Sequence, residues 1–165
     1  MDMKNPFESP TTFKLHRAEY AVGWVVTSVL IVLHWNEIRL IPAILLFLYI
    51  DLIGYIPGAI AFRRSPDGRI SKNYYIAYNT MHSFITQGAV VAIWGFTIGW
   101  EWALLLIPWH VFADRGIYGN FLKPFSLPFE PHAAPGYRRL IDELSAGTPG
   151  VSGDRPAEAA AVPST

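Results

Sequence analysis

The sequence predicts an all-α, polytopic membrane protein whose core is a four-helix transmembrane bundle. Of its 165 residues, 52% are hydrophobic, and the mean hydropathy of +0.26 is high for a soluble domain of this size. The charged residues are unevenly distributed: Arg39 is the only basic residue between Arg17 and Arg63, and there is none between Lys72 and Arg115. Long apolar runs separated by short polar segments are typical of a chain that crosses a bilayer several times.

Four apolar runs are each long enough for a helix that crosses the hydrocarbon core, which takes about 20 residues. We expect these helices at residues 18–35, 40–62, 75–100 and 101–118. Pro57 and Gly58 should bend or loosen the end of the second helix, and Pro108 lies inside the fourth. Membrane helices tolerate such prolines where neighbouring groups satisfy the freed backbone carbonyl.

The basic residues decide the orientation of these helices, because short cytoplasmic loops carry an excess of lysine and arginine. With four spans, the N-terminal segment, the loop at 63–75 and the C-terminal segment share one side of the membrane. Only Arg39 lies on the other side, whereas all others of the 13 lysines and arginines lie on the first. We therefore expect both termini to be cytoplasmic.

Outside the helices the chain is polar or rich in proline. We divide it into a polar N-terminal segment (1–12), the four-helix transmembrane domain (13–120), a membrane-surface segment (121–144) and a disordered tail (145–165). The surface segment is predicted to lie along the membrane or to fold back under the bundle, with a short helix at 137–144. The tail is mainly alanine, glycine, proline, serine and threonine, a composition that does not form a packed core.

Composition also excludes several classes of site. The chain has no cysteine, which rules out disulfides, thiol catalysis and iron–sulfur clusters. The formal net charge is +0, so nothing in the charge balance favours nucleic acid as a partner. Membrane lipid is the partner that the pattern favours, and a homo-oligomer is compatible with it.

Ionisable side chains lie within the apolar runs at helical spacing. His110 and Asp114 are four residues apart and share one helix face, while Asp51 lies near the middle of the second helix. A charged side chain at the centre of a membrane helix costs about 2.5–3.5 kcal/mol on insertion scales, so such residues need partners. In the predicted topology these three residues and His82 fall in the cytoplasmic half of the bundle.

Imidazoles and carboxylates without thiols are the ligands of a hard or borderline divalent ion. We predict that four side chains bind such an ion and leave one position for water, with zinc as the candidate. They are Asp51, His82, His110 and Asp114. A water activated there is able to attack an ester or a phosphoester. We assign catalysis to three of these residues, Asp51, His82 and Asp114, and to Glu19; the general base is Glu19 or a carboxylate that does not bind the ion.

Substrate binding is assigned to four further residues. Arg115, together with the basic loop at 63–75, is placed to attract an anionic headgroup. The others are Tyr55, Asn79 and Tyr118.

Several of these residues also have a purely structural interpretation. Asp114 and Arg115 are compatible with an interfacial pair at a helix end. His82, near a helix start, is able to bond Asn79 or a backbone carbonyl without any ligand. Asp51 is the hardest to explain in this way, because it lies too deep to reach the interface easily.

Two spaced motifs resemble a known family. The first reads Tyr78-Asn79-x-x-His82-Ser83, and the second reads Trp109-His110-x-x-x-Asp114-Arg115-x-x-Tyr118-Gly119-Asn120, with Asp51-x-x-x-Tyr55 upstream. Across residues 45–125 this pattern is similar to a family of small bacterial four-helix membrane proteins of unknown function. The resemblance implies a multi-pass protein of the bacterial inner membrane.

More distantly, the order of an aspartate, a His-Ser pair and a His-x-x-x-Asp motif is similar to the membrane-bound metal-dependent hydrolases. That resemblance implies the same four metal ligands, which are Asp51, His82, His110 and Asp114. This chain has Met81 where those hydrolases have a threonine before the histidine.

The sequence thus favours an integral membrane enzyme that uses a divalent metal to hydrolyse a lipid or another amphipathic substrate from the cytoplasmic side. Two alternatives stay open. One is a metal-free acid–base catalyst, such as an isomerase or cyclase acting on an apolar substrate, in which Asp51 is a protonated acid. The other is a non-catalytic membrane subunit in which the polar cluster only orders the bundle.

Overall fold

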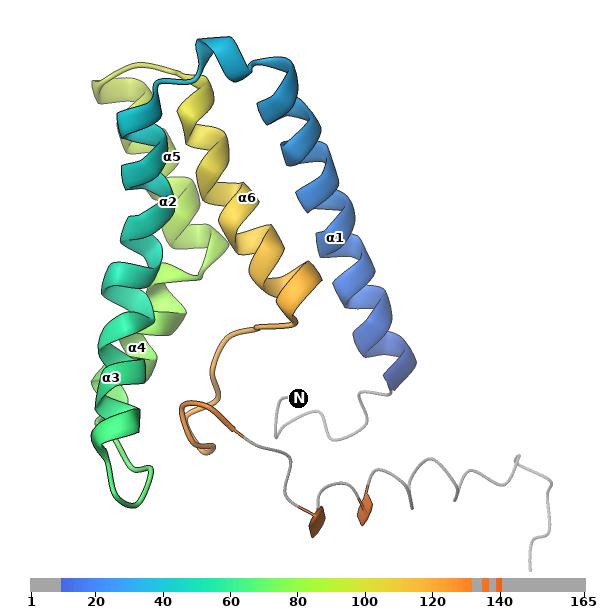
Figure 1. The fold of residues 1–165 in the computed structure, drawn as a ribbon, viewed down its shortest axis with the longest axis vertical. Coiled ribbons are helices and arrows are strands. Elements are labelled where there is room, and N and C mark those ends of the chain that lie inside the picture. The colour runs from blue at the N-terminus through green and yellow to red at the C-terminus, as the bar shows by residue number, and fades with distance from the viewer. Residues whose placement is uncertain (1–9, 132–134, 137–138, 141–165) are drawn as a thin grey trace, which may run out of the picture. The chain divides into compact units, whose positions relative to one another are not determined.

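A computed structural model describes residues 10–131, 135–136 and 139–140. The chain divides into two compact units, Met1–Glu130 and Pro131–Thr165, and the first contains every element named below. The described residues form helices and connections without a strand, as the sequence predicts. In chain order the elements are α1 (Pro10–Leu33), η1 (Trp35–Glu37), α2 (Leu40–Gly54), α3 (Ile56–Arg64), α4 (Lys72–Met81), α5 (Phe84–Thr97), η2 (Trp102–Leu105), α6 (Leu106–Ala113) and η3 (Asp114–Tyr118) (Figure 1).

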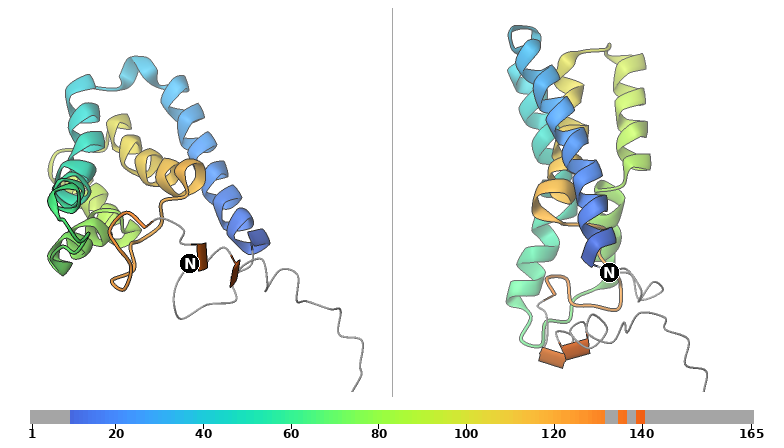
Figure 2. Two further views of the ribbon diagram at one scale, coloured as in Figure 1. Left: turned by 60° about the horizontal axis from the view of Figure 1, so that its bottom comes forward. Right: turned by 90° about the vertical axis from the view of Figure 1, so that its right-hand side faces the viewer.

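The elements of the first unit line up in rods that alternate in direction (Figures 1 and 2). The first rod is α1, the second is α2 with α3, the third is α4 with α5, and the fourth is η2, α6 and η3. The fourth rod packs against the other three through α6, and α4 packs against α2 and α3. The rods correspond to the four helical segments predicted from the sequence.

The second predicted helix is confirmed, together with its weak point. α2 ends at Gly54 and α3 begins at Ile56, so the break falls at Tyr55. Pro57 occupies the first turn of α3, where its missing N–H removes no intrahelical hydrogen bond.

The third helix was predicted to be continuous from 75 to 100, but the structure has two helices there. α4 ends at Met81 and α5 begins at Phe84. The side chain of Ser83 accepts a hydrogen bond from the backbone N–H of Ile85 and so caps a new helix at this point. His82 therefore lies in a hinge between two helices instead of inside one.

The fourth rod also differs from one continuous helix. The 3₁₀ turn η2 leads into α6 at Leu106, so Pro108 falls in the first helical turn and not in a helix interior. The first N–H groups of a helix have no intrahelical partner, so this proline breaks no helical hydrogen bond. Beyond Ala113 the helix widens into the π turn η3, which ends at Tyr118 before the left-handed Gly119.

Two apolar clusters hold the unit together. One lies between α2, η2 and α6 and includes Ile50, Ile107 and Val111. The other joins α3 and α4 to the segment after η3 through Phe129, whose side chain is fully buried. The segment 121–130 thus folds back against the helices, which is one of the two arrangements expected for it.

Large apolar side chains cover the outside of the rods. More than half of the surface is exposed in Val22, Val29 and Val32 of α1, in Leu40, Ile41 and Leu45 of α2, and in Ile85, Ile93 and Phe96 of α5. Within the described residues, Leu40–Arg64 is the helix that is long and apolar enough to cross a membrane. Its most apolar stretch of 18 residues has a mean hydropathy of 2.0, and 22% of that stretch is buried. α5 is apolar but shorter. The multi-pass topology and the cytoplasmic termini therefore stay predictions.

A group of polar contacts joins the rods at the end opposite segment 121–130, and we call it the end clasp (Figure 1). It consists of His34, Glu37, Arg39, Glu101 and Trp102. Two guanidinium nitrogens of Arg39 donate to different oxygens of Glu101, each at 2.7 Å. Glu37 accepts a hydrogen bond from the indole of Trp102 at 3.0 Å and lies 2.8 Å from Nδ1 of His34.

The segments predicted before and after the four helices lie partly outside the residues that the structure describes. The polar N-terminal segment is described only from Pro10, where α1 begins. The tail at 145–165 and most of the predicted helix at 137–144 lie outside the described ranges.

Candidate metal centre

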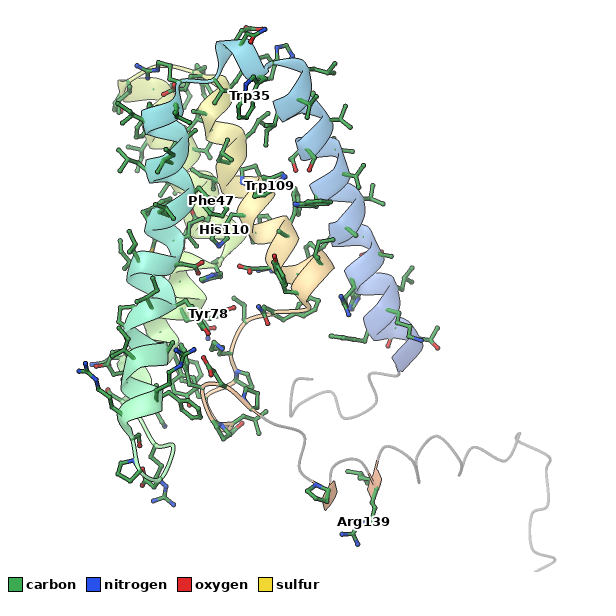
Figure 3. All side chains as sticks on the ribbon, viewed as in Figure 1. Trp35, Phe47, Tyr78, Trp109, His110 and Arg139 are labelled. Atoms are coloured by element: carbon green, nitrogen blue, oxygen red, sulfur yellow. The ribbon has the colours of Figure 1, made fainter. Side chains whose placement is uncertain are left out.

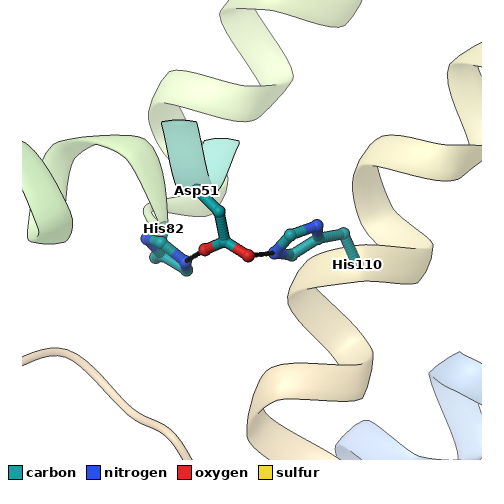
Figure 4. Close-up of side chains that lie close together, drawn as sticks. All are labelled: Asp51, His82 and His110. Atoms are coloured by element: carbon teal, nitrogen blue, oxygen red, sulfur yellow. Dashed lines mark ion pairs between the residues drawn. The ribbon is translucent and has the colours of Figure 1, made fainter. Parts of the chain in front are cut away.

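Four of the predicted site residues converge between α2, the α4–α5 hinge and α6, and we call them the His–Asp cluster. Nε2 of His82 lies 3.3 Å from Oδ1 of Asp51 and 3.3 Å from Oδ2 of Asp114. Nε2 of His110 lies 3.5 Å from Oδ2 of Asp51 and 3.4 Å from the same Asp114 oxygen. Ligand atoms of the first aspartate and both histidines all lie within 4.8 Å of one another, so these three could hold a metal ion. Figure 4 shows Asp51 between the two imidazoles.

Backbone carbonyls fix the orientation of both imidazoles. Nδ1 of His82 lies 2.9 Å from the carbonyl oxygen of Tyr78, and Nδ1 of His110 lies 3.0 Å from that of Phe47. Figure 3 shows where Phe47, Tyr78 and His110 lie on the rods. A carbonyl oxygen only accepts, so Nδ1 carries the proton in each ring, and Nε2 of the neutral imidazole is left with a lone pair. Both Nε2 atoms face the carboxylates. Metal-binding histidines are usually oriented by such a contact at their other nitrogen.

The distances between imidazole nitrogens and carboxylate oxygens in the His–Asp cluster are longer than those of charge-assisted hydrogen bonds. A charged N–H donor and a carboxylate oxygen normally lie about 2.7–2.9 Å apart, whereas the four distances here are 3.3, 3.3, 3.5 and 3.4 Å. Oδ2 of Asp114 is buried and accepts no hydrogen bond from the described residues. An unpaired buried acceptor is unfavourable by about 1–3 kcal/mol, and more when it is charged. The carboxylates are therefore arranged for a positive partner that the surrounding side chains do not supply at hydrogen-bond distance.

A tetrahedral divalent ion fits this spacing. Ligand atoms bound about 2.0–2.1 Å from such an ion lie about 3.3–3.4 Å from one another. Octahedral coordination with bonds of the same length brings neighbouring ligands closer, to about 3.0 Å. The observed distances of 3.3–3.5 Å are close to the tetrahedral value, and they join the two imidazoles to both oxygens of Asp51 and to one oxygen of Asp114. Two imidazole nitrogens with carboxylate oxygens and no thiol form a donor set that suits zinc and related ions.

The four side chains of the cluster differ in exposure. Those of His82, His110 and Asp114 are 4%, 5% and 17% exposed, whereas that of Asp51 is 39% exposed. The sequence-based expectation that His110 faces the interior is confirmed. Structural metal sites are enclosed by their ligands, whereas catalytic sites keep one accessible position. The exposed side of Asp51 provides such access.

Side chains around the α4–α5 hinge fix the position of His82. Gln87, fully buried in α5, donates from Nε2 to the carbonyl of Met81 and accepts a hydrogen bond from the hydroxyl of Tyr49. Gly54 of α2 lies directly against the hinge. A Cβ atom there would lie 2.8 Å from Cβ of Met81 and 3.2 Å from Cε1 of His82. The close approach of α2 to the hinge therefore requires a residue without a side chain at this position.

Arg115, which the sequence analysis assigned to substrate binding, contacts the same hinge. Its buried guanidinium donates to the carbonyl of His82 at 3.0 Å and to the hydroxyl of Tyr20 at 3.1 Å. Its Cζ atom also lies 5.1 Å from the ring centroid of Tyr20 and 4.6 Å from that of Phe84, within the range of cation–π attraction. These contacts account for the charge of Arg115 without a substrate.

The π turn η3 begins at Asp114 of the His–Asp cluster. The carbonyl of this residue accepts hydrogen bonds from the N–H groups of Gly119 and Asn120, the second at 2.7 Å. Gly116 lies so close to α1 that a Cβ atom there would be 2.5 Å from the backbone nitrogen of Ala21. Such π turns recur at functional sites, where they change the direction of a side chain.

Two predicted site residues lie on exposed surfaces. Glu19, the predicted general base, is exposed on α1 and forms no ion pair with the cluster within the described residues. Tyr118 is 71% exposed at the end of the π turn. Their assigned roles stay predictions.

The other two predicted substrate-binding residues hold segment 121–130. The side-chain amide of Asn79 donates to the carbonyl of Lys123 at 2.9 Å and accepts from its backbone N–H at 2.7 Å. The hydroxyl of Tyr55 donates to Glu130 at 2.7 Å. These bonds tie the segment to α4 and to the break between α2 and α3.

Comparisons of this chain with family models, with curated proteins and with solved structures find no match. The family resemblance inferred from the motifs is therefore neither supported nor contradicted by them. Function has to be inferred from the His–Asp cluster and from the surface around it.

Proposed function

We propose that this protein is an integral membrane enzyme that uses a divalent metal ion, with zinc as the candidate, to hydrolyse a lipid or another amphipathic substrate. The observation that carries this proposal is the spacing of 3.3–3.5 Å between two Nε2 atoms and two carboxylates. A metal-free acid–base site would bring a protonated group and its acceptor to hydrogen-bond distance. The observed spacing favours an ion between them.

The chemistry follows from the different exposure of the two carboxylates. A divalent ion in this donor set supplies a Lewis acid and lowers the pKa of a coordinated water to about 7. His82, His110 and Asp114 would hold the ion from the buried side, together with one oxygen of Asp51. The other oxygen of Asp51 is suited to accept a proton from the water, because the side chain is 39% exposed and presents one oxygen toward each imidazole. Asp51 thereby takes the general-base role that the sequence suggested for Glu19.

The molecular surface supports a membrane location. Only 22% of the 18-residue apolar stretch within Leu40–Arg64 is buried, whereas the core helix of a soluble protein is mostly buried. Exposed apolar side chains also cover α1 and α5. In a bilayer these side chains face acyl chains, and the helical backbone satisfies its own hydrogen bonds. A multi-pass arrangement with both termini in the cytoplasm agrees with the distribution of basic residues.

Metal analysis tests the first part of this function. The wild-type protein, purified in detergent with any affinity tag removed, loaded with Zn²⁺ and dialysed, is expected to retain one ion per chain. His82→Ala and His110→Ala should lose it. His34→Ala, which removes an imidazole from the end clasp, should keep it. A wild-type protein that retains no divalent ion contradicts the proposal, as does a His110→Ala variant that retains the same amount.

Hydrolysis is tested separately, with carboxylic and phosphoric esters that carry acyl chains and are presented in detergent micelles. Turnover should disappear on chelation, return with added metal, and be absent in a folded Asp51→Asn variant. Turnover that survives chelation would identify the metal-free acid–base catalyst instead. Metal binding without turnover of any ester class would favour the non-catalytic subunit.

A further inference from the structure

We propose that Lys123 forms a phosphate-binding subsite beside the His–Asp cluster, so that the amphipathic substrate carries a phosphate group. This inference rests on the proposed function and deepens it by naming the charged part of the substrate. Its basis is the position of the Lys123 ammonium, which the proposed hydrolytic chemistry does not use.

The backbone of Lys123 is held in one place. Both its N–H and its carbonyl are bonded to the amide of Asn79, at 2.7 and 2.9 Å. Further along segment 121–130, Phe129 is fully buried and packs so closely on α3 that a Cβ atom at Gly58 would clash with its ring. A lysine anchored on both sides presents its ammonium at a defined point, as a binding site requires.

The ammonium of Lys123 lies among aromatic rings. Its Nζ atom is 4.3 Å from the ring centroid of Phe129, 4.6 Å from that of Tyr78 and 5.7 Å from that of Tyr55. It donates one hydrogen bond, to the carbonyl of Phe129 at 2.6 Å. No carboxylate of the described residues forms an ion pair with it. An ammonium has three donor hydrogens, so most of its capacity is available to an anion.

The surroundings of Lys123 connect it to the candidate metal centre. The ring of Tyr78, over which the ammonium lies, stacks on the ligand His82 with a centroid distance of 4.0 Å and an interplanar angle of 15°. Burial lowers the pKa of the Lys123 ammonium, while the negative charges of Glu130 and Asp114 act in the opposite direction. The ammonium is thus poorly hydrated and close enough to the cluster to be affected by its charge.

Other cations near the end of the fourth rod are occupied by backbone carbonyls. Arg115 donates to the carbonyl of His82. Arg17 donates to the carbonyls of Gly116 and Ile117. Lys123 differs from them in that its cation lies among aromatic rings, and one of its three donor hydrogens is used within the described residues. A compact ammonium is also a common phosphate-binding group.

Cobalt substitution gives a direct test, because the visible absorption of Co²⁺ reports on its ligands. Wild-type protein loaded with Co²⁺ is titrated with inorganic phosphate in detergent, and separately with phosphatidic acid or phosphatidylcholine in nanodiscs. We expect phosphate or phosphatidic acid to change the spectrum of the wild type and of Lys123→Arg. In Lys123→Met the affinity should fall about tenfold or more, as for a lost charged hydrogen bond. Lys72→Met, which removes an exposed lysine at the start of α4, is the matched control.

The outcomes separate the two levels of inference. A wild-type protein that binds no Co²⁺ defeats the proposed function. A protein that binds Co²⁺ but responds to neither phosphate nor phosphatidic acid defeats only the phosphate subsite, as does a Lys123→Met affinity equal to that of the wild type. A response to phosphatidic acid alone identifies a lipid headgroup as the source of the phosphate. If Lys123→Met does not fold, Lys123→Gln makes the same comparison, because it removes the charge and keeps a donor for the carbonyl of Phe129.

Discussion

The end clasp and the His–Asp cluster use the same kinds of side chain at different distances. In the clasp, the guanidinium of Arg39 contacts both oxygens of Glu101 at 2.7 Å. In the cluster, no nitrogen approaches a carboxylate oxygen closer than 3.3 Å. The clasp is complete within the protein, whereas the cluster is shaped for a partner. The two regions thus differ by about half an ångström in the distance between nitrogen and carboxylate oxygen.

Charge balance separates the two regions further. The clasp pairs a permanent cation with its carboxylate. In the cluster, two carboxylates face imidazoles whose Nδ1 protons are committed to backbone carbonyls. If the imidazoles bind an ion through Nε2 they are neutral, and a divalent cation would then balance the negative charge of the two carboxylates. The predictions below alter one region and use the other as its control.

The largest effect is expected from removing a ligand. His82→Ala should weaken Zn²⁺ binding by more than about 100-fold, which exceeds the about 10–100-fold typical of groups that only orient ligands. Glu37→Gln in the end clasp should leave the affinity unchanged. Competition with a chromogenic chelator measures both. Equal losses in the two variants would mean that the affinity reflects folding alone.

Metal removal should destabilise the protein through the cluster and not through the clasp. At a free metal concentration 100 times the dissociation constant, the bound ion adds about 2.7 kcal/mol to the free energy of unfolding. Chelation should therefore lower the Tm of the wild type, measured by thermal unfolding in detergent. Asp114→Asn, which neutralises the buried ligand, should show no such shift. A wild-type Tm that does not respond to metal would remove the basis for an ion in the cluster.

A substitution that touches no ligand directly should have a smaller effect. Gly54→Ala places a Cβ atom 2.8 Å from Cβ of Met81 and 3.2 Å from the ring of His82, so the ring has to move. We expect about 10–100-fold weaker metal binding, as for other changes that reorient a ligand. Gly88→Ala is the matched control, because its Cβ would meet no atom within 4 Å. Identical affinities in the two variants would show that Gly54 is not needed to position His82.

The smallest effect concerns the pH dependence of the clasp. The hydrogen bonds from Arg39 hold the pKa of Glu101 below its ordinary value of 4.5. A carboxylate with a lowered pKa contributes its stabilisation fully above the ordinary value, and loses it as the pH falls through the lower value in the folded protein. Metal-free wild type should therefore lose more thermal stability between pH 6 and pH 3 than metal-free Glu101→Gln. Parallel pH profiles would show that the clasp does not depend on this charge.

The four rods and the four residues of the His–Asp cluster could be predicted from the sequence. Hydrophobic runs indicate helices, and i, i+4 spacing indicates which residues share a helix face. His110 and Asp114 were identified in this way, and Asp51 stood out as a charge in an apolar helix. The hinge at His82 could not be predicted from the sequence. A serine within an apolar run either stays inside one helix or caps a new one, and tertiary contacts decide which of the two occurs.

The groups that orient the cluster were harder to predict. The carbonyls of Phe47 and Tyr78, which accept from the imidazoles, leave no trace in a pattern of side chains. Gln87 gave a usable signal, since an amide within an apolar helix needs a partner. The contacts of Arg115 could not be read from the sequence, because a charge at a helix end has two solutions, exposure at the interface or burial against a carbonyl, and only the fold decides between them.

X-ray absorption spectroscopy of the Zn²⁺-loaded protein tests the central claim most directly. The predicted result is a first shell of nitrogen and oxygen at about 2.0–2.1 Å, with the outer-shell scattering of two imidazoles. One imidazole should disappear from the spectrum in His110→Ala, and none in the end-clasp variant His34→Ala. A first shell without imidazole scattering, or one that changes with His34 and not with His110, would contradict a metal centre built from the His–Asp cluster.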